Sequence, residues 1–395
     1  MRTTIREISL GVFDGPHATP PPSETGALYL GIGAIGKDGY IDEGKAKRIA
    51  LEDLPKWTRR VTPRAGDIVF SYEATLNLYA IIPSGFRGCM GRRIGLIRPD
   101  TSKVSIKFLF YYFFSPQWRA LIKSKTVQGA TVDRLSIEDF PDFPVDLPVL
   151  ETQERIVRML EPYDALIENN RRQIKLLEEA AQRLYKEWFV DLRFPGYEHT
   201  PIVNGMPQGW RMMQLDQIAD IECGQSPKSE YYNTLGEGLP FHQGVGSYGA
   251  RFVKDDTYSS VYSKVAPAGS ILFSVRAPVG RLNVTMNEVA IGRGLAAMNH
   301  VRNRQSFLFY MLKAHFFKED LAGNGAIFAS ISKPELKKMK FRVPGEDLQE
   351  LFEAEASRLD AKLAVLVKQN DLLTEARDRL LPKLMSGEIE APALS

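Results

Sequence analysis

The sequence predicts an α+β protein: two mixed α/β domains separated by two long antiparallel coiled-coil helices, with the halves related by a pseudo-two-fold internal repeat. The first observation is that the chain repeats itself about 196 residues apart, so that Pro148 aligns with Pro344 and Asp164 with Asp360. The second is that each repeat ends in a long segment whose apolar residues follow a heptad spacing. The third is that the sign of the net charge alternates along the repeat.

The repeat sets the predicted domain boundaries. Further matched positions are Gly129-Ala130 with Gly325-Ala326, Gln153 with Gln349, Leu184 with Leu380, residues 65–71 with 268–274, and residues 108–111 with 307–310. The predicted segments are a first domain at 1–147, a helical spacer at 148–196, a second domain at 197–343 and a second spacer at 344–395. Two halves with unrelated chemistry would not align in this way, so we expect two domains of one kind.

Each spacer carries a continuous seam in steps of four and three residues. The first seam is Ile156, Leu160, Tyr163, Ile167, Asn170, Ile174, Leu177, Ala181, Leu184 and Trp188. The second seam is Phe352, Ala356, Leu359, Leu363, Leu366, Asn370, Leu373, Arg377 and Leu380. Either helix alone would expose its apolar stripe, so we expect the two to pack against each other in antiparallel orientation.

One asparagine in each seam predicts a register in which Asn170 faces Asn370. The other layers then pair Ile174 with Leu366, Leu177 with Leu363, Ile167 with Leu373, Ala181 with Leu359, Leu184 with Ala356, Trp188 with Phe352, and Tyr163 with Arg377. A slip by one heptad would bury each amide against aliphatic side chains at a cost of about 1 to 3 kcal/mol. A solvent-exposed asparagine on a frayed seam is the alternative. Pro162 predicts that the first helix is kinked or begins near that residue.

The composition is that of an ordinary globular protein, with 395 residues, 44% hydrophobic content and a net charge of +3. Residues 1–147 and 199–343 carry excesses of four and six basic side chains, whereas residues 148–198 and 344–395 carry excesses of two and five acidic ones. Basic domains favour a polyanion as ligand, while acidic helices suit protein partners. No apolar leader or membrane span is seen, so we expect a cytoplasmic protein that binds no membrane.

Catalytic and cofactor motifs are weak. Two cysteines and five scattered histidines offer no metal-ligand spacing, so no catalytic residue and no metal ligand is predicted. Residues 31–36 and 244–249 match the G-x-G-x-x-G dinucleotide fingerprint, but the residues after the first match predict a turn and a strand rather than the required helix. One such loop in each domain indicates paired turns rather than a single cofactor site.

The candidate nucleic-acid contacts are basic residues beside glycines and aromatic residues, because these positions can approach base edges and phosphates. In the first domain they are Arg59, Arg60, Arg64, Arg87, Arg92, Arg93, Lys125 and Arg134. In the second domain they are Lys228, Arg251, Arg276, Arg281, Arg293 and Lys333, with Gln243, Tyr248 and Asn324 as polar partners. A solvated surface role is the alternative for each.

Four segments make the chain resemble the specificity subunit of type I restriction-modification systems along its full length. They are residues 13–17 (FDGPH), 147–157 (LPVLETQERIV), 188–196 (WFVDLRFPG) followed by 207–210 (PQGW), and 381–389 (LPKLMSGEI). The resemblance implies two target-recognition domains, each reading one half of a split double-stranded DNA target, with the helices fixing the unread gap.

The resemblance also implies partners. These are two DNA methyltransferase subunits that carry S-adenosylmethionine, and restriction and translocase subunits that use ATP and Mg²⁺, so that this chain needs no cofactor of its own. The methyltransferases would contact the acidic spacers, with Glu168, Glu178, Glu355 and Glu375 as participants. The protein would then work at the nucleoid. Three alternatives stay open: a methylation-only or type IIB-like system, a nucleotide-binding enzyme acting through the glycine loops, and a scaffold that dimerises through its coiled coil.

Overall fold

The computed structural model describes residues 2–127, 132–316 and 330–392. The chain forms two compact units: unit 1 is Met1–Glu168 with Asn370–Ser395, and unit 2 is Asn169–Gln369. Both units are mixed α/β folds with equivalent sheets, which confirms the predicted α+β class and internal repeat. The sequence-based boundaries treat the spacers as separate segments, whereas the contacts divide each long helix between the two units.

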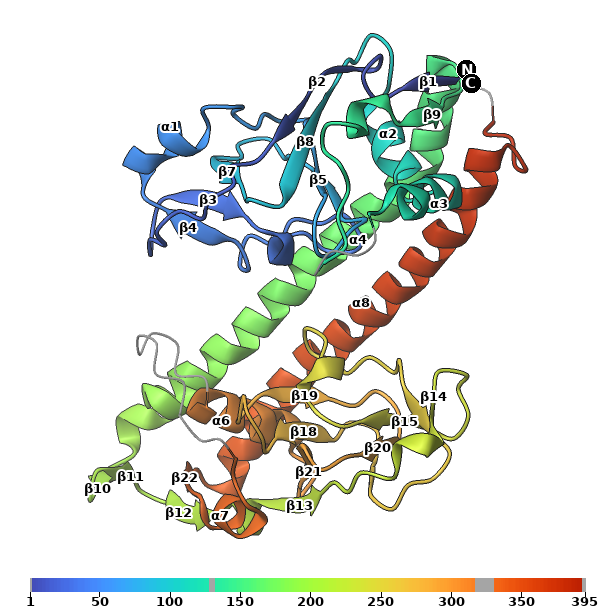
Figure 1. Cartoon of the computed structure of the whole chain (residues 1–395). Helices are drawn as coiled ribbons and strands as arrows, with labels where there is room; N and C mark the ends of the chain where they lie inside the picture. The colour runs from blue at the N-terminus through green and yellow to red at the C-terminus, as the bar shows by residue number, and fades with distance from the viewer. Residues whose placement is uncertain (1, 128–131, 317–329, 393–395) are drawn as a thin grey trace. The chain divides into compact units, whose positions relative to one another are not determined.

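Unit 1 is built from short strands and three helices (Figure 1). The strands are β1 (Arg2–Thr4), β2 (Ser9–Asp14), β3 (Ala27–Leu30), β4 (Lys47–Ile49), β5 (Ile68–Ser71), β6 (Tyr79–Ile81), β7 (Gly88–Met90), β8 (Ile94–Pro99) and β9 (Pro144–Asp146), and the helices are α1 (Leu54–Trp57), α2 (Ile106–Tyr112) and α3 (Pro116–Lys125). Their sheets have the orders β2-β8-β5-β6, β4-β3-β7 and β1-β9. Neighbouring strands are antiparallel except for β3 and β7, which are parallel.

The alternation of side chains along β5 and β8 places the four-stranded sheet between two cores. Phe70 of β5 belongs to a large core that includes Phe108 of α2. Val69 and Leu96 lie on the opposite face and pack in a second core with Leu30 of β3. Unit 1 is therefore layered, with α2 and α3 on one face of the sheet and the three-stranded sheet on the other.

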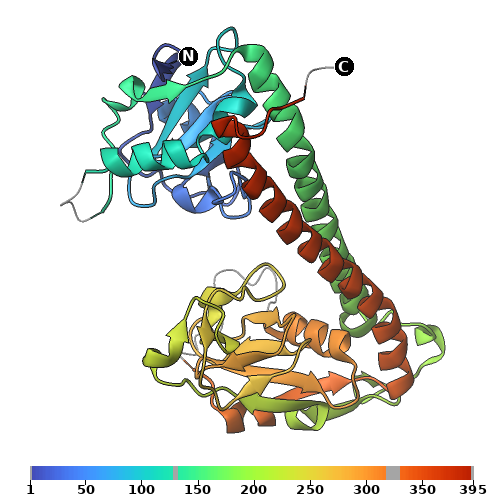
Figure 2. The same cartoon turned by 90° about the vertical axis from the view of Figure 1, so that its right-hand side faces the viewer.

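Unit 2 repeats this plan with additional strands (Figure 2). They are β10 (Ile202–Val203), β11 (Met206–Pro207), β12 (Arg211–Gln214), β13 (Ala219–Cys223), β14 (Tyr232–Asn233), β15 (Leu239–His242), β16 (Tyr258–Ser259), β17 (Val265–Ala266), β18 (Ile271–Ser274), β19 (Leu282–Val284), β20 (Val289–Ile291), β21 (Leu295–His300) and β22 (Lys340–Val343), with helices α5 (Leu215–Ile218), α6 (Gln305–Phe316) and α7 (Lys333–Lys338). The sheet β13-β21-β18-β19 corresponds to β2-β8-β5-β6. Within the sheet β14-β16-β15-β20-β17, the parallel pair β15 and β20 corresponds to β3 and β7.

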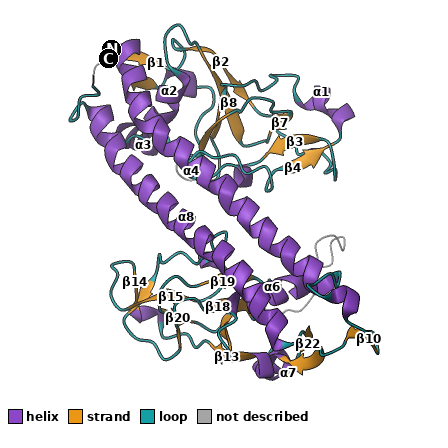
Figure 3. Ribbon diagram, turned by 180° about the vertical axis from the view of Figure 1, so that it is seen from behind, coloured by secondary structure: helices purple, strands orange, loops and turns teal. Residues whose placement is uncertain are grey.

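Two long helices, α4 (Leu150–Tyr185) and α8 (Glu346–Ser386), contribute one end to each unit (Figure 3). In unit 2, the ring of Trp188 lies 6.0 Å from that of Phe352, and the Asn170 amide donates to Oε1 of Gln369 at 3.0 Å. The helices are therefore antiparallel within this unit. In unit 1, Arg377, expected opposite Tyr163, forms an ion pair with the adjacent Asp164 at 2.6 Å.

The predicted seam is buried to different degrees along its length. Its buried residues are Ile156, Leu160, Ile167, Asn170, Ala181, Phe352, Ala356, Leu363 and Leu366. Its half-buried residues are Ile174, Leu177, Asn370 and Leu373. Near the end of α4, Tyr185 and Phe189 are buried although the heptad pattern selected Leu184 and Trp188. Both α8 and the globular part of unit 2 cover this end of α4. The ring of Phe189 lies 5.4 Å from that of Phe307 of α6, measured between centroids.

Pro162 lies inside α4, which begins at Leu150, so the predicted helix start near Pro162 is wrong. Proline removes one backbone hydrogen bond, but Ile156 and Leu160 before it are buried in the core of unit 1 and hold the helix on that side. Within the described residues, no helix combines the length and hydropathy needed to cross a bilayer.

Candidate nucleic-acid interface

In unit 1, the ends of several strands meet around a turn at residues 91–93, between β7 and β8, which we call arginine loop 1. The N–H of its first residue donates to the carbonyl oxygen of Leu30, at the end of β3, at 2.7 Å. Tyr72, after β5, donates to the carbonyl oxygen of its last residue at 3.2 Å, and Gly15, after β2, donates to the first residue of β8 at 3.1 Å. Three strand ends therefore hold the loop at one edge of the unit.

Unit 2 contains the equivalent turn at residues 292–294, between β20 and β21, which we call arginine loop 2. Its first and last residues donate to the carbonyl oxygens of His242, the last residue of β15, and Gln243, which follows it, at 2.8 and 3.1 Å. Gly224, after β13, donates to the first residue of β21 at 2.9 Å, and Val275, after β18, donates to the last residue of the loop at 2.9 Å. The same strand ends thus meet in both units.

Glycine is required where the loops touch. A Cβ on Gly15 would lie 2.3 Å from the carbonyl oxygen of Gly91, and one on Gly224 would lie 2.2 Å from that of Gly292. Real Cβ atoms do not approach backbone oxygen so closely. The two equivalent glycines therefore let the strand that opens each sheet end directly against its arginine loop.

Several predicted residues of unit 1 gather around arginine loop 1. Arg92 is exposed on the loop. Arg93 pairs with Glu73 at 3.1 Å, and a backbone bridge joins Glu73 to the segment carrying Arg134, whose side chain is exposed. These three arginines come from two separate parts of the sequence and share one edge of the fold.

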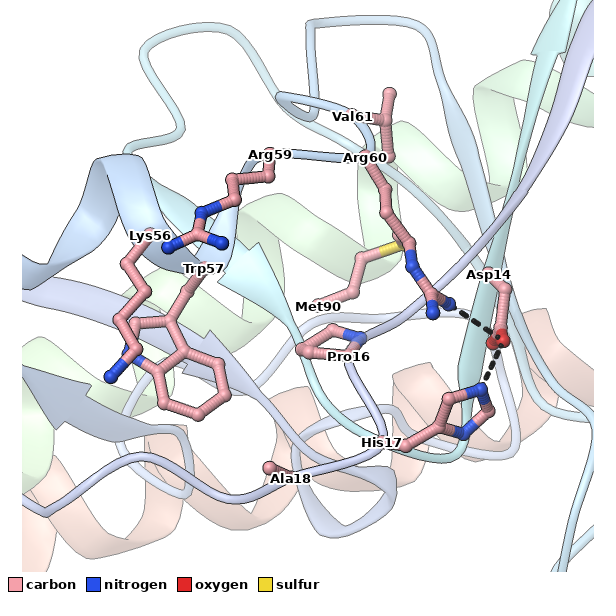
Figure 4. A pocket seen from close by; sticks show the side chains of 10 residues that line it. All are labelled: Asp14, Pro16, His17, Ala18, Lys56, Trp57, Arg59, Arg60, Val61 and Met90. Carbon is pink, nitrogen blue, oxygen red and sulfur yellow. Dashed lines mark hydrogen bonds and ion pairs between the residues drawn. The ribbon is translucent and has the colours of Figure 1, made fainter.

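Next to this loop is a pocket, shown in Figure 4, whose polar and aromatic lining comes from Asp14, His17, Lys56, Trp57, Arg59 and Arg60. Asp14 Oδ2 lies 3.0 Å from Arg60 Nη1 and 3.0 Å from His17 Nε2. Arg59 and Arg60 were predicted from sequence, whereas His17, Lys56 and Trp57 were missed as contacts. Their signal was present, because His17 follows the Gly15 turn and the other two stand just before the predicted arginines.

Three predicted residues of unit 1 lie elsewhere. Arg64 is exposed before the start of β5, and Arg87 is exposed before β7, whereas arginine loop 1 follows the end of β7. Lys125 ends α3 and sits over the ring of Phe143 at 5.7 Å. Sequence proximity to glycine selected these residues, but the strand direction places Arg64 and Arg87 at the other end of their strands.

In unit 2, Arg293 stands on arginine loop 2, and its backbone N–H donates to Ser226 Oγ at 3.1 Å. Gln243 is exposed and its carbonyl oxygen binds the same loop. Four other predicted cations of unit 2 have exposed side chains: Lys228 after β13, Arg276 and Arg281 in the turn after β18, and Lys333 in α7. Lys228 pairs with Glu230 at 3.7 Å, and Lys333 pairs with Glu222 at 3.8 Å.

Of the residues predicted to contact DNA, Arg251 is buried and Tyr248 is partly buried. The side chain of Arg251 is 3% exposed and pairs with Asp360 at 2.8 Å, and its guanidinium lies 3.3 Å from the centroid of the Phe309 ring. The Tyr248 hydroxyl donates to the carbonyl oxygen of Leu272 at 2.9 Å. Both side chains point into unit 2 because their aromatic and charged partners lie there, so we remove them from the candidate contacts. Asn324 and the Gly129-Ala130 match lie outside the described residues.

The two glycine-rich matches occupy equivalent places, after β3 and after β15. Each continues into a three-residue 3-10 turn, Ile32–Ala34 in unit 1 and Val245–Ser247 in unit 2. A dinucleotide fingerprint needs an α-helix whose N-terminus faces the pyrophosphate. Neither loop has that geometry, as the sequence predicted. In unit 2, the buried His242 holds the loop through Ser247 Oγ at 2.8 Å and Asp255 at 3.1 Å, which lowers the pKa of Asp255.

A repeated tyrosine–aspartate contact attaches the globular part of each unit to a helix. In unit 1, the hydroxyl of Tyr111 donates to Asp164 of α4. In unit 2, the hydroxyl of Tyr310 donates to Asp360 of α8 at 2.8 Å. Burial raises the pKa of both tyrosines, so they remain neutral donors. In each unit an arginine also pairs with this aspartate, but it comes from a different element. In unit 1 it is Arg377 of α8, and in unit 2 it is Arg251, from the loop after the glycine-rich turn.

No group of three or more His, Cys, Asp or Glu side chains arranged to hold a metal ion occurs among the described residues. Burial raises the pKa of the Cys89 thiol to about 12, which keeps it protonated and unreactive at neutral pH. Burial also raises the pKa of Cys223. The exposed groups gathered at the arginine loops are mainly hydrogen-bond donors, which suits a polyanion rather than a chemical step.

Comparisons with known proteins point to the same class. The sequence profile of the family "Type I restriction modification DNA specificity domain" matches residues 36–179 and 207–370. The chain is 28% identical, over 90% of its length and 84% of the relative's, to a protein of Methanocaldococcus jannaschii provisionally named the type I restriction enzyme MjaX specificity subunit. It is 22% identical to the type I restriction enzyme HindI specificity subunit of Haemophilus influenzae, covering 86% of this chain and 90% of the relative.

A solved structure agrees in fold. The type I restriction-modification S subunit from M. genitalium aligns over 100% of this chain and 96% of its own, with a TM-score of 0.55 and 18% identity. The family profile matches once in each half of the chain, as the duplicated sheets do. The chain therefore belongs to the type I restriction-modification DNA specificity family, as a targeting subunit rather than a catalytic one.

Proposed function

We propose that each unit reads one half of a bipartite DNA target, with its arginine loop facing the duplex. The observation that carries this proposal is the duplicated arginine loop, which the same strand ends hold in both units. Arg92 and Arg293 occupy equivalent exposed positions on these loops. Arginine is the side chain that most often reads a guanine edge in the major groove, and it also binds phosphate. Two like sites on one chain match two half-sites on one duplex.

The two long helices set the length of the unread gap in this proposal. The support is that α4 is one continuous helix and that each unit takes up one end of both α4 and α8. The aspartates that anchor the globular parts, Asp164 and Asp360, are on these helices. An insertion in the helices would then change the spacing of the half-sites without changing the bases that are read.

The helices also dock two methyltransferase subunits in this proposal. This docking is supported by exposed large apolar side chains on the helices, which are Leu166 and Leu176 on α4 and Val365 and Leu372 on α8. Leu176 and Leu372 are related by the internal repeat, as two identical partners would require. Of the predicted acidic participants, Glu178 is already paired with Lys313 at 2.7 Å, which weakens its case as a partner contact.

The partners supply the chemistry in this proposal. The methyltransferase subunits carry S-adenosylmethionine and methylate adenine, and restriction subunits use ATP and Mg²⁺. A methylation-only or type IIB-like assembly would need the same two reading sites and differs only in these partners. The complex would act on DNA in the cytoplasm, at the nucleoid.

The test is co-expression of the full chain with its cognate methyltransferase, followed by long-read mapping of methylated adenines. We expect methylation at one bipartite motif with a fixed gap. Exchanging residues 224–300 for those of a related chain should alter one half-site only, and inserting four residues into both α4 and α8 should widen the gap only. A contiguous motif, or an unchanged gap after the insertion, would refute the corresponding part of the proposal.

A further inference from the structure

The pocket of unit 1 offers its ligand donors and positive charge. His17, Lys56, Arg59 and Arg60 line it together with Trp57, and Figure 4 shows Lys56, Trp57 and Arg59 on one side and His17 and Arg60 on the other. Lysine and arginine side chains have donors but no acceptors. The Trp57 indole N–H is buried and has no hydrogen-bond partner among the described residues, so it is not counted among the donors presented to a ligand. A ligand that satisfies this lining must present acceptors and negative charge.

Asp14, the acidic residue in the lining, does not make the pocket suited to a positively charged ligand. One carboxylate oxygen of Asp14 is held by Arg60 and His17, each at 3.0 Å. Its other oxygen is buried and is therefore not presented to a ligand. Asp14 thus orients His17 and Arg60 and offsets the charge of Arg60, while Lys56 and Arg59 remain exposed with no ion pair to an acid among the described contacts.

The shape of the site favours phosphate over a base. On a duplex, base edges lie on the floor of a groove and are read by protruding side chains or elements, whereas the phosphates stand on the ridges. This site is hollow, with a volume of about 430 Å³. A concave, donor-lined site therefore accommodates a ridge, and the exposed arginine loop beside it is suited to the groove.

Unit 2 does not repeat the Asp14 and His17 pair of this site. Aligning Gly15 with Gly224 places Cys223 at the position of Asp14 and Ser226 at that of His17. The positioning carboxylate and the imidazole are therefore both replaced by residues without charge. The carboxylate that positions an imidazole and an arginine therefore occurs in unit 1 and not at the equivalent residues of unit 2, so the reading role common to both units does not explain it.

We infer that the pocket of unit 1 clamps a backbone phosphate of the DNA duplex through Lys56 and Arg59, with His17 and Arg60 held in place by Asp14. This inference rests on the proposed DNA-reading function and adds a sequence-independent anchor in unit 1. The contact contributes affinity and fixes the position of the duplex, and it carries no base specificity.

The experiment uses the full chain in complex with its methyltransferase. Equilibrium binding is measured over a series of salt concentrations, to a duplex with the mapped motif and to a scrambled duplex. For Lys56→Gln with Arg59→Gln, we expect affinity for both duplexes to fall by the same factor, about 10- to 30-fold near physiological salt. The salt dependence should weaken by about 1 to 2 in logarithmic slope, and the methylated motif should not change.

The matched control is Arg64→Gln with Arg87→Gln, which removes two charges at the other end of the strands and should leave affinity and slope unchanged. The charge-conserving Lys56→Arg with Arg59→Lys should retain most of the slope, which separates lost charge from lost folding. A motif relaxed at one guanine in the Lys56 and Arg59 variant would mean a base contact and overturn the phosphate assignment, as would an unchanged slope. A wild-type complex without a bipartite motif would instead refute the proposed function.

Discussion

Replacing Asp360 with asparagine tests how unit 2 is fixed to α8. Asp360 accepts hydrogen bonds from Arg251 and Tyr310, each at 2.8 Å. The Arg251 side chain is 3% exposed and that of Asp360 is 18% exposed. The substitution keeps the shape of the side chain but leaves a buried guanidinium without a counter-charge, and Nε and Nη1 of Arg251 already have no partner among the described residues.

The expected cost follows from the loss of one member of a buried pair. Breaking such a pair destabilises a protein by about 3 to 5 kcal/mol, and Coulomb attraction at about 4 Å with an effective dielectric constant near 20 gives about 4 kcal/mol. Water can reach Asp360 in part, so we take the lower end, about 3 kcal/mol. The stacking of Arg251 on Phe309 would remain and would hold the charge in place.

Hydrogen exchange of the full chain measures this cost separately in each unit. We expect protection of the sheet β13-β21-β18-β19 to fall roughly 100-fold in Asp360→Asn, since each 1.4 kcal/mol is a factor of ten. The sheet β2-β8-β5-β6 in unit 1 is the internal control and should keep its protection. Adding Arg251→Met should restore at least half of the loss, because the unpaired charge is then removed. A change below about fivefold in the single variant would refute this account of the cluster.

Four further outcomes are expected. Burial and the nearby Arg304 lower the pKa of His300 to about 4, so between that pH and about 6.5 the unfolded chain binds a proton that the folded chain does not. Unit 2 should therefore lose up to about 3 kcal/mol of stability between pH 7 and pH 4. Urea unfolding of the His300→Gln variant should lack this dependence on pH. Tyr111→Phe should destabilise unit 1 by about 1 to 1.5 kcal/mol in the exchange assay, and no loss would mean that the contact with α4 is unimportant. Native Cys89 should resist a thiol reagent at pH 8 that modifies the denatured chain at once; equally fast modification would contradict its burial. Gly15→Ala should push arginine loop 1 aside and alter methylation at one half-site, whereas an unchanged motif and yield would argue against a role for that loop.

The arginine loops show where sequence patterns stop predicting a site. Arg92 and Arg293 were selected because they lie beside glycines, and both stand on equivalent exposed loops. Arg251 met the same criterion, yet it is buried against Phe309 and Asp360. Local composition cannot distinguish these cases, because burial depends on a partner more than a hundred residues away in the chain. The same limit applies to Arg64, because it precedes β5 and arginine loop 1 lies beyond the other end of that strand.

The sequence by itself determined the duplicated architecture, the two long helices and the family. Heptad spacing and repeated segments are visible in the order of the residues and do not depend on contacts between distant parts of the chain. It did not determine which cations share a surface, why Pro162 leaves α4 unbroken, or that Asp14 joins His17 and Arg60 in one pocket. These features depend on which strand ends meet and which side chains the core encloses. Such long-range contacts form only when the chain closes into its tertiary structure.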